Sequence, residues 1–239
     1  MPEPTLPKAL AFDVFGTVVD WRTSVTRESA VFLERIGQDP GTAAAFADAW
    51  RRQYIAAMIG MKKSGRPFVP LDVLHREILD GLLPRFGLGA LTDAERAELN
   101  RVWHRLAAWP DSVAGLTRLK ARFTICSLSN GNIGLLTNMA RRAGLPWDCV
   151  LSAEVFRAYK PDPATYLGVA STFDLSPAQV MVGPAHPDAR AAARACGLAT
   201  AYIERPLEFG AAHLKDVSPD PANTWHARSL VDLADQLGC

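Results

Sequence analysis

The stretch that decides the fold is KALAFDVFGT, residues 8–17. Its first half is apolar up to Phe12, which predicts a short buried strand, and Asp13 follows this apolar run. Gly16 and Thr17 then predict a turn. In open α/β sheets, ligands bind at the carboxyl ends of the strands. The stretch therefore places an acidic side chain where such a sheet presents its functional groups.

Further short apolar segments alternate with helical patterns over the second half of the chain. They predict strands at 123–128, 149–151, 180–182 and 198–203. The patterns between and after them predict helices at 112–121, 132–143, 163–173, 187–196 and about 229–237. Alternation of this kind predicts an α/β fold, namely a Rossmann-like, doubly wound parallel sheet. Residues 205–227 are expected to form a long polar loop.

Residues 20–108 differ, because no segment there has a convincing strand pattern. Four helices are expected, roughly at 22–37, 41–60, 70–85 and 92–107. Thr92 is a candidate N-cap, with Glu95 at the spacing of a capping box. We therefore predict a core domain made of 1–19 and 110–239. An all-helical cap domain, 20–109, is inserted into it.

Composition and charge argue against several classes of protein. The formal net charge of +1 gives no overall field that would recruit nucleic acid. No segment reaches the roughly 20 apolar residues that span a membrane, and the first residues lack the basic and apolar regions of a signal peptide. The four scattered cysteines form no CxxC pair. A reducing, cytoplasmic location is the simplest expectation.

Polar residues follow several of the predicted strands. They are Asp13, Ser129 with Asn130, Lys160 and Asp188. Each has an ordinary explanation when taken alone, since Asp often caps a turn, Asn-Gly often forms one, and lysine is common on surfaces. The carboxyl ends of parallel strands lie at one edge of a sheet, so these side chains are expected to converge. Convergence favours a functional site.

These residues resemble the four motifs of the haloacid dehalogenase superfamily. Residues 13–17, DVFGT, are similar to its DxxxT motif, in which the Asp is a nucleophile. Residues 128–131 resemble the second motif, 159–162 the third, which carries a lysine, and 181–188 stand where the acidic fourth motif belongs. The ordered set covers nearly the whole chain. The resemblance implies that Asp13 is a covalent nucleophile.

Two positions separate the chain from the phosphatases of that superfamily. Phosphatases carry a second, acid/base Asp two residues after the nucleophile, and we assign the apolar Val14 to that place. Pro184 stands where their fourth motif supplies an Asp ligand for Mg²⁺. Asp13 and Asp188 alone would make a poor site for an ion that needs several hard oxygen ligands. We therefore expect neither a metal nor another cofactor.

An apolar residue beside the nucleophile is typical of the L-2-haloacid dehalogenases (type II), which use no metal. Trp50-Arg51 is similar to a pair in that group whose Arg faces the active site. The resemblance implies a short-chain 2-haloacid as substrate, hydrolysed through an aspartyl ester to a 2-hydroxyacid. A leaving halide needs no protonation, so an acid beside Asp13 would have no role in the reaction. Dimers are common in the group, so the resemblance allows a homodimer.

The resemblance also implies a role for each residue of the site. Lys160 would keep Asp13 ionised, Arg51 would bind the halide or the substrate carboxylate, and Asp188 would activate water as general base. The remaining candidates for substrate binding are Thr17, Ser129, Asn130 and Tyr159.

The fourth motif departs from the dehalogenase pattern. That group has an Asn three residues before the motif's Asp, where Ala185 stands here, and the adjacent His186 is a candidate to replace it. Two other functions stay open on these grounds. One is a phosphatase acting on a small phosphate ester, and the other is a non-catalytic binding protein that keeps the fold.

Overall fold

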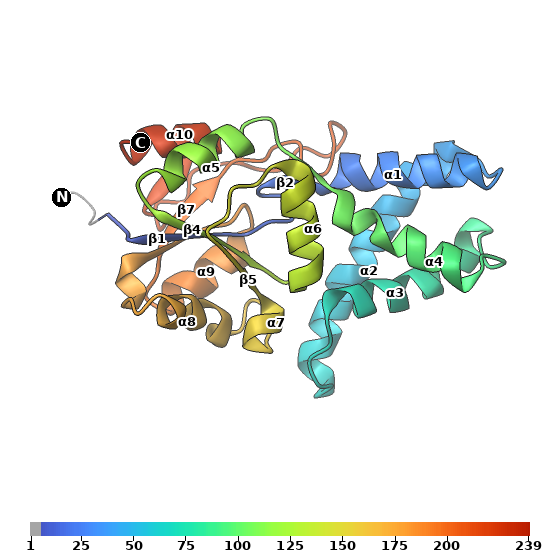
Figure 1. Cartoon of the computed structure of the whole chain (residues 1–239), viewed down its shortest axis with the longest axis horizontal. Coiled ribbons are helices and arrows are strands. Elements are labelled where there is room, and N and C mark those ends of the chain that lie inside the picture. The colour runs from blue at the N-terminus through green and yellow to red at the C-terminus, as the bar shows by residue number, and fades with distance from the viewer. Residues whose placement is uncertain (1–5) are drawn as a thin grey trace.

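The computed structural model describes residues 6–239, apart from the side chains of 59 and 62–64. Residues 1–4, whose sequence lacks the features of a signal peptide, lie outside the described range. The molecule has two parts, a sheet flanked by helices and a block of helices beside it (Figure 1). No helix among the described residues is long and apolar enough to cross a membrane.

The first part is built on six parallel strands in the order β5–β4–β1–β6–β7–β8. These are β1 (Ala9–Phe12), β4 (Thr124–Ser129), β5 (Cys149–Ser152), β6 (Val180–Gly183), β7 (Ala199–Ile203) and β8 (Trp225–Ala227). All four residues of β1 are fully buried, as expected of a central strand covered on both faces. The predicted parallel α/β sheet is therefore confirmed. β8 was not predicted, because it is a three-residue strand that ends a polar loop.

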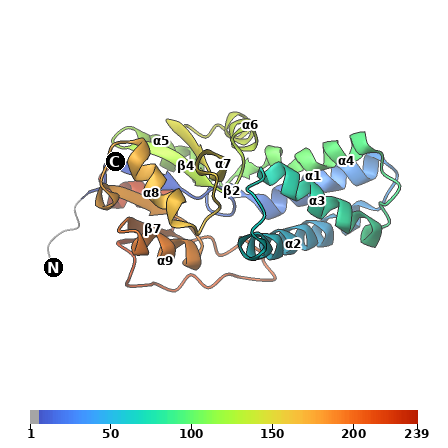
Figure 2. The same ribbon diagram turned by 90° about the horizontal axis from the view of Figure 1, so that it is seen from below.

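Helices cover both faces of the sheet (Figures 1 and 2). They are α5 (Ser112–Lys120), α6 (Ile133–Ala143), α7 (Ala153–Phe156), α8 (Pro163–Thr172), α9 (Pro187–Ala195) and α10 (Leu230–Gln236). The side chains of β1 alternate between two cores. Leu10 and Phe12 belong to the larger one, with α5, α6 and α10, whereas Ala11 packs in the smaller one with α8 and α9.

The second part consists of α1 (Trp21–Arg35), α2 (Ala43–Ser64), α3 (Leu71–Leu82) and α4 (Asp93–Asn100). Thr92 caps α4 through the predicted capping box with Glu95. The fourth helix was predicted to continue to 107. It ends at Asn100 instead and is followed by a 3₁₀ segment, Arg101–Arg105. That the block constitutes a separate cap domain with the predicted boundaries stays a prediction.

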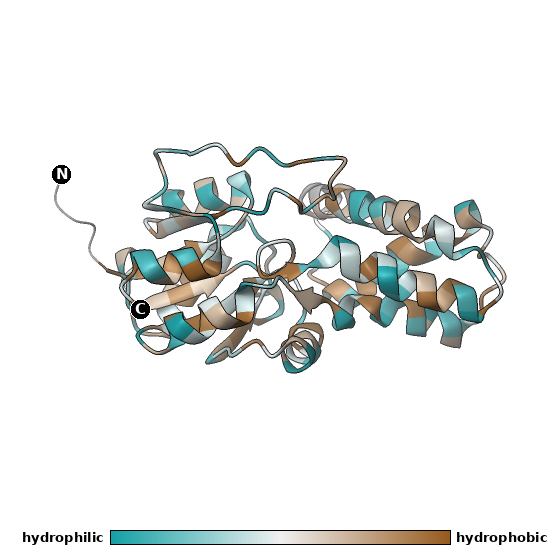
Figure 3. Cartoon of the chain, turned by 90° about the horizontal axis from the view of Figure 1, so that it is seen from above, coloured by the Kyte–Doolittle hydropathy of each residue, from teal (hydrophilic) through white to brown (hydrophobic). Residues whose placement is uncertain are grey.

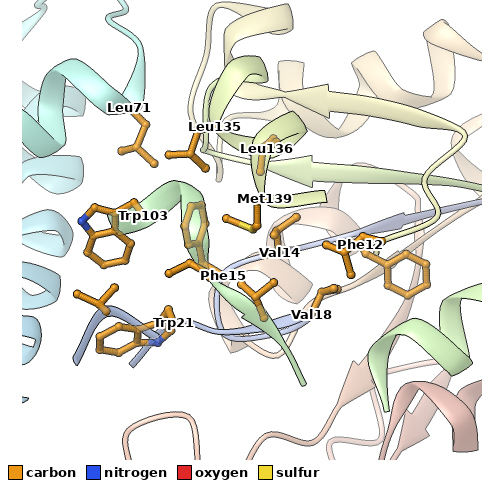
Figure 4. Packing of buried hydrophobic residues seen from close by; sticks show 14 of the residues in the cluster. Phe12, Val14, Phe15, Val18, Trp21, Leu71, Trp103, Leu135, Leu136 and Met139 are labelled. Atoms are coloured by element: carbon orange, nitrogen blue, oxygen red, sulfur yellow. The ribbon is translucent and has the colours of Figure 1, made fainter. Parts of the chain in front are cut away.

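Two short strands mark where the chain passes between the two parts. β2 (Val19–Asp20) and β3 (Ala107–Ala108) pair antiparallel, so the outgoing and returning segments lie side by side. Aromatic side chains fill this junction (Figure 4). Trp103 stacks on Trp21 with centroids 6.3 Å apart and packs edge-on against Phe15 at 6.1 Å. The turn that follows Asp13 is thereby fixed against the helical block.

The long loop between β7 and β8 crosses the surface as an extended trace along one side of the molecule (Figure 3). Its first residues are anchored rather than free. Arg205 donates from Nε to the carbonyl of Thr17 at 2.7 Å and pairs with Asp111 at 2.9 Å. Glu208, three residues on, is fully buried. The start of the loop therefore packs against the turn that follows Asp13.

Candidate active site

Asp13 follows β1 directly, and its side chain is only 9% exposed. Three groups contact its carboxylate. Lys160 donates from Nζ to Oδ1 at 2.5 Å, and the hydroxyl of Thr17 donates to Oδ2 at 2.9 Å. His186 approaches the same Oδ2, with Nδ1 3.1 Å away. Both carboxylate oxygens are thus held in place by residues of the sheet-containing part of the molecule.

The surroundings keep Asp13 ionised although it is buried. Burial alone would raise the pKa of its carboxyl group, but the charge of Lys160 and the hydrogen bond and charge of His186 outweigh that effect. The pKa therefore lies well below its ordinary value. An ionised carboxylate with little access to water is a good nucleophile, because it loses little hydration when it attacks.

Lys160 is itself tightly positioned. Its ammonium group also donates to the carbonyl of Leu128 at 2.8 Å, and its backbone N–H donates to Oδ1 of Asn130 at 2.8 Å. Asn130 in turn donates from Nδ2 to the hydroxyl of Tyr54 on α2 at 3.2 Å. Asn130 therefore connects the lysine of the core to the helical block above it.

Two predicted substrate-binding residues lie beneath the site. The hydroxyl of Thr17 accepts a hydrogen bond from the N–H of Ala185 at 2.9 Å, and that of Ser129 accepts one from Gly131 at 3.1 Å. Both side chains are fully buried. Their observed contacts fix the turns around Asp13, and direct substrate contact stays a prediction.

Arg51 reaches the site from α2. Its guanidinium lies over the rings of Tyr54, 4.8 Å from the centroid, and Trp21, at 5.3 Å. The side chain is buried, and its Nε has no hydrogen-bond partner among the described residues. A buried cation with an unused donor is suited to bind an anion.

These groups enclose a cavity of about 210 Å³. Its lining includes five of the eight residues that the sequence predicts for the site, and Tyr54, Tyr166 and Ala189 are among the lining residues that the sequence did not predict. Tyr159 instead lines a neighbouring cavity, where its ring packs on Phe68 and its hydroxyl donates to the carbonyl of Val69 at 2.5 Å. The lining of the first cavity is Asp13, Phe15, Arg51, Tyr54, Asn130, Lys160, Pro161, Tyr166, His186, Asp188 and Ala189.

The apolar residue that lines the cavity beside Asp13 is not the predicted one. Val14 is 1% exposed and packs in the larger core, whereas Phe15 lines the cavity. Phe15 is also the residue two places after Asp13, which is the spacing of a DxD pattern. The assignment of Val14 to this place is therefore wrong. The position still lacks the acid/base Asp of the phosphatases, because a phenylalanine side chain can act neither as an acid nor as a base.

A second carboxylate stands behind His186. Its Nε2 lies 2.9 Å from Oε1 of Glu208, whose Oε2 accepts a hydrogen bond from Lys215 Nζ at 2.7 Å. Lys215 also donates to the carbonyl of Ala185 at 2.6 Å. Glu208 and Lys215 were missed by the sequence analysis, because both lie in the long polar loop and match no motif.

Gly16 makes room for this carboxylate. Its φ of +80° is a left-handed conformation, and a Cβ there would overlap with Oε1 of Glu208. Glycine therefore satisfies two requirements at this position. It allows the turn that follows Asp13, and it lets a fully buried glutamate pack against the backbone of that turn.

The His186 and Glu208 side chains stabilise each other's charged forms. Burial would lower the pKa of His186, but hydrogen bonds to Asp13 and Glu208 raise it above its ordinary value. Burial would raise the pKa of Glu208, but His186 and Lys215 lower it to about 2. Both shifts favour the imidazolium form of His186, which lies between two carboxylates.

Asp188 is placed differently. It lies in the first turn of α9, is exposed, and lines both cavities. Among the described residues, no hydrogen bond or ion pair joins it to Asp13 or Lys160. Its predicted role as general base stays a prediction.

The donor set does not fit the Mg²⁺ site of the phosphatases. Lys160 and His186, two cations, contact the two oxygens of Asp13, and a divalent ion there would face their positive charges. Pro184 offers no side-chain ligand. Among the described residues, no three His, Cys, Asp or Glu side chains are grouped so as to hold a metal ion.

Comparison with known proteins agrees with this geometry. A family model of haloacid dehalogenase-like hydrolases matches residues 7–195. The chain is 33% identical over 176 residues to (S)-2-haloacid dehalogenase 1 of Pseudomonas sp. (strain CBS-3), which covers 72% of this chain and 74% of that protein. The structure of a defluorinating L-2-haloacid dehalogenase superposes with a TM-score of 0.94 at 43% identity, covering 99% of this chain and 100% of the other.

A second L-2-haloacid dehalogenase structure superposes with a TM-score of 0.89, also at 43% identity, and covers 98% of this chain and 100% of the other. The fold, the order of the motifs and the sequence identity over most of the chain therefore all indicate the same family. The chain belongs to the haloacid dehalogenase-like hydrolases and, within them, to the group of the (S)-2-haloacid dehalogenases.

Proposed function

We propose that this protein hydrolyses short-chain (S)-2-haloacids to 2-hydroxyacids through an ester on Asp13, without a metal ion. One observation carries the proposal. The carboxylate of Asp13 is buried and held ionised on the core side of a small cavity, and the guanidinium of Arg51 lines the same cavity from α2. This arrangement provides a nucleophile and, near it, a site for an anion.

The cavity suits the substrate in size and charge. A volume of about 210 Å³ admits a small acid. The substrate carboxylate and the departing halide are both anions, and Arg51 is available to bind either, since its Nε has no partner among the described residues. Asn130 adds an amide group at the same wall. Phe15 and Tyr166 supply apolar surface for the carbon chain.

The chemistry follows from the state of Asp13. An oxygen of its carboxylate attacks C2 and displaces halide, which leaves as a stable anion and needs no proton. Lys160 and Thr17 hold the carboxylate for attack. Water then attacks the carboxyl carbon of the new ester and releases the hydroxyacid. Two displacements thus replace one difficult hydrolysis.

Halide release from L-2-chloropropionate and chloroacetate tests the proposal. We expect turnover that survives exhaustive treatment with EDTA, and no comparable hydrolysis of p-nitrophenyl phosphate in the presence of Mg²⁺. Phosphate-ester turnover that requires Mg²⁺ would instead identify a phosphatase. Binding of a 2-haloacid without any halide release would identify a non-catalytic binding protein. A cytoplasmic location and a homodimer stay predictions from the sequence.

A further inference from the structure

Hydrolysis of an ester on Asp13 needs a base within reach of its carboxyl carbon. Two side chains that line the cavity are candidates, His186 and Asp188. His186 has a ring nitrogen 3.1 Å from Oδ2 of Asp13. Asp188 is exposed, and no hydrogen bond among the described residues joins it to Asp13. The two candidates therefore differ in position and in burial.

We propose that His186 is the catalytic base that activates water against the Asp13 ester, and that Glu208 is the residue that positions it. This inference rests on the proposed function, because it concerns the second half of that reaction. It assigns to a histidine the role that the sequence motif suggests for Asp188.

The geometry determines which ring nitrogen of His186 acts as the base. Nε2 of His186 faces Glu208 at 2.9 Å, and Glu208 is fully buried and held from its other oxygen by Lys215. Glu208 therefore retains the proton on Nε2 and orients the ring. Nδ1 is the nitrogen that faces Asp13, so a single water molecule can bridge Nδ1 and the carboxyl carbon.

The first half of the reaction prepares the base for the second. In the free enzyme His186 lies between the carboxylates of Asp13 and Glu208, and the nearby cations Lys160 and Lys215 each contact one of those carboxylates. Alkylation turns Asp13 into a neutral ester. His186 then keeps only one anionic partner, which favours loss of the proton from Nδ1. Formation of the ester thus leaves Nδ1 of His186 unprotonated and able to accept a proton next to the ester.

The steps balance. Alkylation forms the bond between Asp13 and C2 and releases halide, and the Nδ1 proton leaves to solvent. Water then gives one proton to Nδ1 while its oxygen bonds to the carboxyl carbon. The tetrahedral intermediate expels the alkoxide, which takes the proton from Nδ1 and becomes the 2-hydroxyacid. The carboxylic acid left on Asp13 returns its proton to Nδ1, which restores carboxylate and imidazolium. The net products are hydroxyacid, halide and one proton.

A rapid-mixing experiment with L-2-chloropropionate separates the two halves in His186→Gln. We expect one halide per active site to be released, followed by turnover about 10²–10⁴-fold below the wild type, with the adduct trapped on Asp13. His226→Gln is the matched control, since His226 also pairs with a glutamate, Glu204, at 2.6 Å, but does not line the cavity. The control should turn over as the wild type does.

Glu208→Gln tests the positioning role separately. The amide can still accept a hydrogen bond from Nε2 but carries no charge to stabilise the imidazolium that forms as water is deprotonated. We expect the halide burst to keep its amplitude while ester hydrolysis slows at least tenfold, with Glu204→Gln as the control. A merely structural role would lower burst and hydrolysis together, and that result would overturn the assignment of Glu208.

A further measurement needs no variant. A pH indicator in weakly buffered solution should show that the wild type releases its proton with the halide burst, before the ester is hydrolysed. Proton release that follows hydrolysis would overturn the proposal, as would wild-type turnover in His186→Gln, or trapping of the adduct in Asp188→Asn but not in His186→Gln. If the proposed function itself is wrong, the wild type will release no halide, and this result is distinguishable from the outcomes above.

Discussion

Nζ of Lys160 lies 2.5 Å from Oδ1 of Asp13, and each of the two side chains is only 9% exposed. Removing one partner of a buried ion pair leaves the other charge uncompensated. In Lys160→Met the pKa of Asp13 should therefore rise toward its ordinary value, and the carboxylate should lose its orientation. We expect the rate of the halide burst to fall at least about 100-fold. Lys120→Met is the control, because Lys120 pairs with Asp148 on the surface; an equal loss there would point to a general effect on folding.

Arg51 should bind an anion through the planar geometry of its guanidinium. Lysine keeps the charge but loses that geometry and the stacking on Tyr54 and Trp21. We expect Arg51→Lys to lower kcat/KM for L-2-chloropropionate at least tenfold, or by about 1.4 kcal/mol. Arg52→Lys, at the exposed neighbour, should leave it unchanged. Equal values for Arg51→Lys and the wild type would remove Arg51 from the site.

The stereochemical course follows from attack by Asp13 on C2. Direct displacement inverts that carbon, and hydrolysis at the carboxyl carbon of Asp13 leaves it untouched. L-2-chloropropionate should therefore give D-lactate, which chiral chromatography of the product can measure. A racemic product, or L-lactate, would exclude a single displacement at C2.

The two half-reactions should respond differently to pH. The lowered pKa of Asp13 means that it stays ionised as the pH falls, so the alkylation rate should hold from about pH 8 to about pH 5. In the ester, Glu208 still faces Nε2 of His186 and favours the imidazolium, so the neutral form of His186 that accepts a proton from water is lost as the pH falls. Ester hydrolysis should therefore slow over the same range. Single-turnover rates of halide and lactate release measure the two steps, and parallel profiles would contradict these assignments.

Much of the fold could be predicted from the sequence because it depends on local patterns. The strand before Asp13, its parallel neighbours and the capping box at Thr92 each follow from apolar runs or from one short motif. The cavity also contains Asp13, Arg51 and Lys160, as the resemblance implies. Tyr159 lines the neighbouring cavity instead, because the residue beside a motif lysine need not point the same way.

The groups behind Asp13 could not be predicted, because they come together only through tertiary packing. Glu208 and Lys215 lie in a loop with no periodic pattern, yet Arg205 anchors the start of that loop to Thr17, and Glu208 packs on Gly16. Nothing local distinguishes Glu208 from an exposed glutamate. Its burial depends on a glycine almost two hundred residues earlier in the chain.

The most direct test of the central claim, that Asp13 is a covalent nucleophile, is a single turnover in H₂¹⁸O with enzyme in excess over L-2-chloropropionate. Water should attack the carboxyl carbon of Asp13, so the label should enter the peptide that contains Asp13, and the lactate formed should carry unlabelled oxygen from the enzyme. Mass spectrometry of the digested protein and of the product measures both. Labelled lactate together with an unlabelled Asp13 would show that water attacks C2 directly, and it would contradict the mechanism.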